Sequence, residues 1–326
     1  MSITVTICYD KSHWDSLVEE SPQGNVFCKT AFLDALHVEY ELYTLLEHGG
    51  ITLGAVVLRQ GESVLKAPYP LTMYHGVLCY SRYQDMACHK RPNWLLERLE
   101  ILFSEMNTRC KRISFSLFHT FEDIRPFQWY HYHEPELGTF TVVPRYTGML
   151  DLMGINDFES YLTQVRTVRR QEYRKALKEG FIVESSDDID LLNKLHGMTF
   201  ERQGIIRKTE EEDLVLSISR AALANSFGEL LVCRDHKGNA ASATLFLYDG
   251  RYGYYHFGAN NPEYRKSGAG TVLLMENIRR CIEKKLAGVD FVGINSPNRG
   301  DFKTSFNAKP TVYFDVDCII PGLSGS

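Results

Sequence analysis

The sequence lacks the features of several protein classes. Its 36 basic residues are outnumbered by 41 acidic ones, which gives a net charge of −5 with neutral histidines and excludes a strongly basic nucleic-acid coat. No apolar run approaches the roughly 18 residues of a membrane span. The first residues, MSITVTICYDKSHW, contain no basic segment followed by an apolar one, as a secretory signal would. We therefore expect no membrane span and no DNA partner.

Cysteine is present but follows no pattern. The eight cysteines are scattered, without a C-x-x-C pair or a dense framework, so we expect free thiols in the cytoplasm rather than disulfides or a zinc site. His131 and His133, beside Glu134, have a spacing that suits two metal ligands on a strand, but no third ligand is evident and their aromatic neighbours favour packing. We expect no metal and no prosthetic group.

The composition is that of a folded chain. Hydrophobic residues make up 44% and charged residues 24% of 326 residues, a length that suggests two domains. We expect them at 1–150 and 151–326. In both, short runs of β-branched and apolar residues alternate with helical periodicity, as at Pro92–Met106. The predicted fold class is α/β (α+β).

A long basic helix is expected to open the second half. An Asn156-x-x-Glu159 capping box starts it and Gly180 ends it. Its basic stripe repeats every four residues and consists of Arg166, Arg170, Arg174 and Lys178. A solvated basic face and a face turned toward an anionic ligand are equally good interpretations of this stripe.

The most informative motif lies between an expected strand, 252–258, and an expected helix, 270–285. It has the form R-x-x-G-x-G and consists of Arg265, Lys266, Ser267, Gly268, Ala269 and Gly270. The first N–H groups of a helix have no intrahelical partner, and the helix dipole favours an anion there. Glycine lets a pyrophosphate approach the backbone, so we expect Gly268→Glu to abolish binding of such a donor.

With this loop, several separated segments resemble the FemAB-like (BioF2-like) branch of the GCN5-related N-acetyltransferase (GNAT) superfamily. They include VRRQEYRKALKEGF from Val168, LHGMTFERQGI from Leu195, HFGANNPEYRKSGAG from His256 and GINSPNRGDFKTSFNAK from Gly293. The resemblance implies two tandem GNAT-like domains, each a mixed central sheet flanked by helices. It also implies transfer of an acyl group from acyl-CoA, or of an aminoacyl group from aminoacyl-tRNA, to an amine.

The resemblance also assigns roles to particular residues. His256, on the strand before the loop, is a candidate proton acceptor, with a packed strand residue as the alternative. Phe302 and Lys303 match the family's Phe-Lys pair, and the lysine would hold a carbonyl oxygen, a phosphate or the terminal adenosine of a tRNA. Asn295 and Ser296, after an expected strand at 289–294, would hydrogen-bond the donor or simply form a turn. In the first half, Tyr74 is a candidate for acceptor binding or for ordinary packing.

These expectations define three functional hypotheses. The preferred one is an acyltransferase that uses acyl-CoA as co-substrate and acts on an amine of a metabolite, nucleotide-linked sugar or precursor peptide. It rests on the intact R-x-x-G-x-G loop. The second is an aminoacyl-tRNA-dependent transferase whose basic stripe binds tRNA. The third is a non-catalytic homologue that binds a nucleotide-linked ligand.

Overall fold

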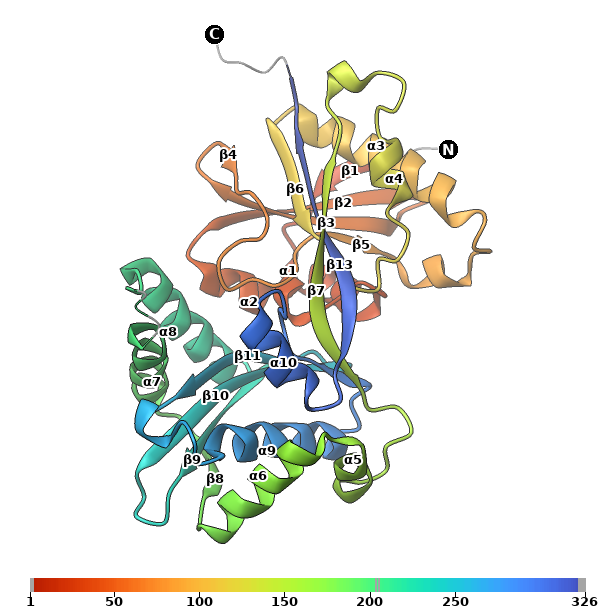
Figure 1. Ribbon diagram of the computed structural model, residues 1–326. Coiled ribbons are helices and arrows are strands. Elements are labelled where there is room, and N and C mark those ends of the chain that lie inside the picture. Colours follow the sequence, from red (N-terminus) through yellow and green to blue (C-terminus); the bar gives the residue numbers. More distant parts are fainter. Residues whose placement is uncertain (1–2, 203, 205, 322–326) are drawn as a thin grey trace. The chain divides into compact units, whose positions relative to one another are not determined.

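The computed structural model describes residues 3–202, 204 and 206–321 (Figure 1). It divides the chain into unit 1, Met1–Arg145 with Val312–Ser326, and unit 2, Tyr146–Thr311. The division near residue 145 lies close to the expected boundary at 150. The last strand, however, belongs to the first unit, because β13 (Lys309–Ile319) pairs with β6 (Arg112–Ser116) there.

Unit 1 contains a five-stranded sheet in the order β1-β2-β3-β4, with β5 also paired to β3. All of these pairings are antiparallel. The strands are β1 (Ile3–Ile7), β2 (Glu39–Glu47), β3 (Gly50–Gln60), β4 (Ser63–Val64) and β5 (Val77–Cys79). The helices are α1 (Lys11–Glu20), α2 (Thr30–Leu33), α3 (Arg91–Asn107) and α4 (Arg125–Trp129).

The predicted helix at 92–106 is confirmed as α3. Its residues Leu95, Leu99, Leu102 and Met106, at spacings of three and four, are all fully buried. They pack with the inward faces of β2, β3 and β6 in one hydrophobic core. Pro92 occupies the first turn, where its missing N–H costs no intrahelical bond.

Unit 2 is built on a mixed sheet in the order β7-β12-β11-β10-β9-β8. Figure 1 shows α6 and α9 against one face of it and α7 and α8 against the other. The strands are β7 (Thr141–Asp151), β8 (Ile182–Ser186), β9 (Gly228–Arg234), β10 (Ala240–Tyr248), β11 (Tyr252–Asn260) and β12 (Gly288–Asp290). The helices are α5 (Phe158–Gln164), α6 (Thr167–Lys178), α7 (Ile189–Glu201), α8 (Thr209–Ala224), α9 (Ala269–Glu283) and α10 (Pro297–Thr304).

Two expectations about unit 2 were wrong. The expected helix from Asn156 to Gly180 is two helices, because Val165 and Arg166 adopt extended backbone between them and the N–H of Arg166 donates to Ser305 O. The cap of the first is Asp157, whose carboxylate accepts from Ser160 N, and not Asn156. The expected strand 289–294 stops at Asp290, and α10 was not foreseen.

Candidate active site

The candidate site lies where two parallel strands of unit 2 part. β11 and β12 pair only over Tyr252–Tyr254 and Gly288–Asp290. β11 continues to Asn260, whereas β12 ends because Val292 and Gly293 have φ angles of +41° and +58°. A left-handed conformation at a β-branched residue breaks the extended backbone. From Tyr255 onward, β11 therefore has no β12 partner.

A β-bulge falls at the same point on β11. In the register with β10, Leu245 pairs with Phe257 and Phe246 with Tyr255, so His256 has no opposite residue. A bulge turns a backbone N–H out of the ladder and re-aims the adjacent side chains. The bulge therefore marks the part of β11 where the backbone departs from the regular ladder with β10.

The bulge also places Tyr255 against Gly258. A Cβ built on Gly258 would lie only 1.9 Å from the Tyr255 hydroxyl oxygen, so glycine is required for the ring to occupy this position. The ring also lies near Phe291, with ring centroids 6.4 Å apart. Burial raises the pKa of Tyr255 to about 12, so its hydroxyl stays protonated at neutral pH.

Burial lowers the pKa of His256 to about 3, and the positive charges of His196 and Lys303 add to the effect. The imidazole is therefore neutral throughout the physiological range. A group with this pKa accepts a hydrogen bond but holds a proton poorly.

The segment after β12 is fixed by polar side chains of unit 2. The buried Asp290 carboxylate accepts from Val292 N at 2.8 Å and from the Thr147 hydroxyl. The Lys303 ammonium, on α10, donates to Val292 O and, at 3.0 Å, to Gly293 O. It also lies 5.6 Å from the centre of the Tyr255 ring. In this conformation Lys303 stabilises the turn that ends β12.

Asn295 and Ser296 lie beyond this turn. The Asn295 amide brackets the backbone of Tyr146, accepting from its N–H at 2.9 Å and donating to its C=O at 3.0 Å. Ser296 is the N-cap residue of α10, although its side chain makes no capping bond. Their roles toward a donor remain predictions.

The R-x-x-G-x-G loop forms the start of α9. Gly268, the N-cap residue of α9, has φ +83°, and Ser267 Oγ accepts from Ala269 N at 3.1 Å. Among the described residues, nothing accepts a hydrogen bond from the backbone N–H of Lys266, Gly268 or Gly270. Arg265 and Lys266 are exposed. The loop thus offers free donors and positive charge to an anion.

Gly268 also packs closely against α6. A Cβ at this position would lie 3.1 Å from Glu172 O and 3.3 Å from the Ala176 Cβ. The expected Gly268→Glu variant would therefore disturb the fold as well as any bound pyrophosphate, so it cannot isolate donor binding.

An arginine outside the predicted basic stripe, Arg169, contacts the start of α9. Its guanidinium binds the Glu172 carboxylate and, at 3.3 Å, the Thr271 hydroxyl on α9, and it lies 5.2 Å from the centre of the Phe302 ring. The sequence shows an arginine at 169, but the spacing of four residues that defined the stripe does not include it.

The basic stripe is shorter than expected. Arg166 lies outside α6 as its N-cap residue and pairs with Asp301 at 3.0 Å. Arg174 and Lys178 are exposed and Arg170 is half-buried. On α6 the stripe is therefore Arg170, Arg174 and Lys178.

Tyr74 does not present a binding surface. Its side chain is fully buried in unit 1, and its ring contacts Phe27, Phe118 and Tyr313 edge-on at centroid distances of 4.9 to 5.9 Å. Of the two roles considered for Tyr74, packing is the one that this geometry supports.

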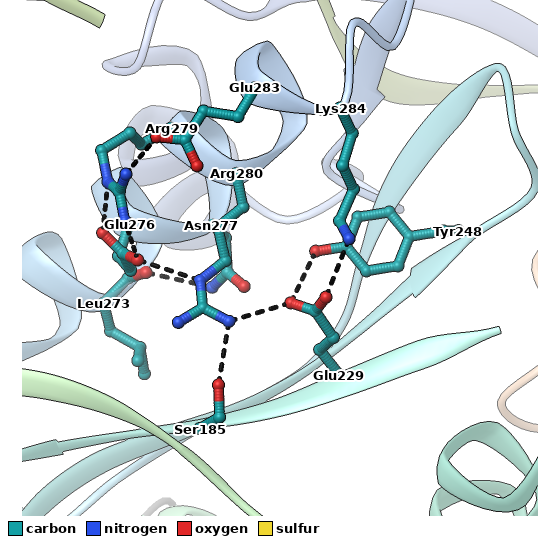
Figure 2. A network of polar contacts seen from close by, with 10 residues as sticks. All are labelled: Ser185, Glu229, Tyr248, Leu273, Glu276, Asn277, Arg279, Arg280, Glu283 and Lys284. Atoms are coloured by element: carbon teal, nitrogen blue, oxygen red, sulfur yellow. Dashed lines mark hydrogen bonds and ion pairs between the residues drawn. The ribbon is translucent and has the colours of Figure 1, made fainter. Parts of the chain in front are cut away.

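The far end of α9 is anchored by the network of ion pairs in Figure 2. Glu229 on β9 accepts from Arg280 at 3.1 Å and from Lys284 at 2.9 Å. Arg280 also binds Glu276 on its own helix and Ser185 on β8. The network fixes α9, and with it the loop at its N-terminus, to two strands.

We expect Glu229→Gln to lower the free energy of unfolding by about 1–2 kcal/mol, since Lys284 loses its counter-charge and the partly buried Arg280 keeps only Glu276. Urea unfolding measures this, with Glu283→Gln, an exposed ion-pair partner on α9, as a control expected to cost less than about 0.5 kcal/mol.

Burial alone would raise the pKa of Glu229, but Lys284 and Arg280 lower it. The stabilisation is therefore present above the unfolded pKa of about 4.3 and is lost as pH falls below it. Equal costs for the two variants would contradict this.

Two properties of the described residues concern metals and membranes. None of their His, Cys, Asp and Glu side chains form a group of three or more that could hold a metal. None of their helices is both long and apolar enough to cross a membrane.

Comparison with known proteins identifies the fold. Residues 163–304 match the family described as acetyltransferase (GNAT) domain. The structure of FemX is similar with a TM-score of 0.71 and 16% identity, covering 96% of this chain and 97% of that one. A conserved protein of unknown function from Bacteroides thetaiotaomicron gives 0.65 and 10%, covering 97% and 100%. A tandem GNAT protein from the clavulanic acid biosynthesis pathway gives 0.54 and 10%, covering 99% and 100%.

A search by sequence among curated proteins finds no match. The structural similarities, all at low identity, concern the fold, and they confirm the predicted tandem GNAT architecture. The family match covers the parting strands, the R-x-x-G-x-G loop and Lys303. Residues 163–304 therefore match the acetyltransferase (GNAT) domain family, within a chain whose fold is similar to those of FemX and of a tandem GNAT protein.

Proposed function

We propose that unit 2 transfers an acyl group from acyl-CoA to an amine and so forms an amide. The observation that carries this proposal is the loop at the start of α9. Its unengaged N–H groups and left-handed Gly268 stand beside the exposed charges of Arg265 and Lys266. Such a loop binds the pyrophosphate of CoA through backbone donors, the helix dipole and two cations.

The reaction would take place at the parted strands. The unprotonated amine attacks the thioester carbonyl, a C–N bond forms, and the C–S bond breaks to release the thiolate of CoA. A backbone N–H of the bulged segment of β11 is our candidate for stabilising the oxyanion. The neutral His256 accepts a hydrogen bond from the amine and orients it, and the excess proton of the amine passes to solvent. The protonated Tyr255 hydroxyl is our candidate donor to the thiolate.

Lys303 has a structural part in this scheme. We expect Lys303→Met to lower the free energy of unfolding by about 1–2 kcal/mol, because charge-assisted bonds to Val292 O and Gly293 O are lost. Thermal unfolding measures the change, with Lys309→Met, an exposed lysine at the start of β13, as the control. A Lys303→Met protein as stable as wild type would remove this structural role and leave only the catalytic one.

Transfer from aminoacyl-tRNA is the second candidate function. It is favoured by the positive side chains of Arg170, Arg174 and Lys178 on α6. Binding of tRNA through these side chains would weaken steeply as salt is raised. A CoA donor would depend on Arg265 and Lys266 instead.

Isothermal titration with CoA and acetyl-CoA tests the proposal. We expect micromolar binding to the wild type and at least tenfold weaker binding to the double variant Arg265→Glu/Lys266→Glu. Both residues are exposed, so their substitution leaves the fold intact. Lys237→Glu, an exposed change on the β9–β10 hairpin, is the control and should bind as wild type does. No binding by folded wild type would reject the CoA donor and favour tRNA. Binding without transfer to any amine would favour the non-catalytic homologue.

A further inference from the structure

Strand β1 forms one edge of the sheet in unit 1. It pairs with β2 on one side, and in the order β1-β2-β3-β4 no strand of the described residues lies on its other side. Its sequence, ITVTI, consists only of β-branched residues and contains no charge, proline or glycine. Proteins usually protect such an edge with lysine, proline or a bulge, and β1 carries none of these.

The side of β1 that faces away from β2 carries backbone N–H and C=O groups. The N–H of Cys8 donates to Leu42 O at 2.7 Å, which continues the β1–β2 register. Because inward and outward groups alternate along an antiparallel strand, the backbone groups of Ile3, Val5 and Ile7 point away from β2. These are the groups that another strand would pair with.

A groove of about 890 Å³ runs beside this edge, between β1 and α3. Its walls are Ile3, Thr4 and Val5 from the strand and five residues of the helix: Glu97, Glu100, Ile101, Ser104 and Glu105. Glu97 pairs with Arg98. The carboxylates of Glu100 and Glu105 form no ion pair within the described residues. The groove therefore combines an apolar floor with unneutralised negative charge.

We propose that β1 binds an extended, basic segment of a partner protein, which adds to the sheet as a further strand. Every second side chain of the added strand would face α3. From Glu97 to Glu105 the helix rises about 12 Å, and alternate residues of a strand are about 6.8 Å apart. Two or three lysines or arginines at alternate positions of the added strand would pack the aliphatic part of their side chains on Ile101. Their charged groups would then reach the glutamates of α3.

A second copy of this chain fits the edge less well. Pairing of β1 with the β1 of another copy would bring the glutamates of both grooves to the same seam. Like charges facing each other across strands are destabilising. The negative wall thus selects a positively charged strand over a self-pair.

Fluorescence anisotropy with a fluorescein-labelled peptide tests this inference. The probe is Lys-Thr-Lys-Thr-Lys-Thr-Lys with a capped C-terminus, and Glu-Thr-Glu-Thr-Glu-Thr-Glu is its charge-reversed control. We expect saturable binding of the lysine peptide only, weakening as salt is raised. Glu100→Lys/Glu105→Lys should weaken it at least tenfold. Glu20→Lys/Glu62→Lys, which makes the same charge change at exposed sites outside the groove, should leave it unchanged.

A second variant tests the backbone pairing separately. Val5→Pro removes an outward-facing N–H without removing a bond to β2, so it should abolish peptide binding while thermal unfolding stays near that of wild type. If Val5→Pro fails to fold, the Glu100→Lys/Glu105→Lys variant alone tests the inference. Equal binding of both peptides, or lysine-peptide binding that survives both variants, would overturn the inference. So would sedimentation showing a dimer of this chain that Val5→Pro dissociates.

Discussion

Gly268→Ala is expected to lower the free energy of unfolding by about 2–4 kcal/mol and to weaken CoA binding. Two costs add. A left-handed conformation costs an alanine about 1–2 kcal/mol, and Gly268 has φ +83°. In addition, the new methyl group would meet Glu172 O at 3.1 Å and the Ala176 Cβ at 3.3 Å. Both neighbours belong to α6, so relief requires α6 and the start of α9 to move apart.

Gly154→Ala separates these two costs. Gly154 has nearly the same φ, +80°, but a Cβ there would meet nothing within 4 Å. It should therefore cost only the backbone term of about 1–2 kcal/mol and leave CoA binding unchanged. Urea unfolding and CoA titration of both variants measure the difference. If the two glycines cost the same, the close approach of α6 to the loop contributes nothing.

The sequence alone predicted several of the elements around the candidate site. As expected, the glycine motif follows a strand and begins a helix. Both elements are determined by local features, which are the glycines themselves and the helical periodicity that follows them. The same holds for α3, where four leucine and methionine side chains at helical spacing are all buried. Periodicity is a local signal, and it is reliable where a helix buries one continuous face.

The details that shape the site depend on tertiary contacts. The bulge at His256 is defined by its register with β10, which strand residues do not reveal by themselves. The end of β12 depends on Lys303, eleven residues after Val292, and on the buried Asp290. The break between α5 and α6 depends on Ser305 O accepting from Arg166. Each is a contact between separate elements, and apolar patterning carries no information about it.

Lowering the pH from 6.5 to 4 is expected to reduce the free energy of unfolding of unit 1 by about 3 kcal/mol through one residue, His75. Its side chain is only 1% exposed, and neither ring nitrogen has a hydrogen-bond partner in the part of the chain that the structure describes. Burial lowers its pKa to about 4. Below the unfolded pKa of about 6.5 the unfolded chain binds a proton that the folded chain does not accept until about pH 4. Stability therefore falls through this window by up to about 1.4 kcal/mol per pH unit.

His75→Leu removes this dependence. Because the imidazole nitrogens are already unpaired, an apolar side chain of similar size should be neutral or stabilising at pH 7. Urea unfolding at pH 7, 6 and 5 should give a flatter profile for the variant than for wild type. The carboxylates of the α9 network lose their contribution only below about pH 4.3, outside this range. The pKa of His256 is also lowered, to about 3, so wild type and variant share the slope that comes from unit 2. Identical profiles would show that His75 gains a proton while folded, which would require a partner or water at its ring.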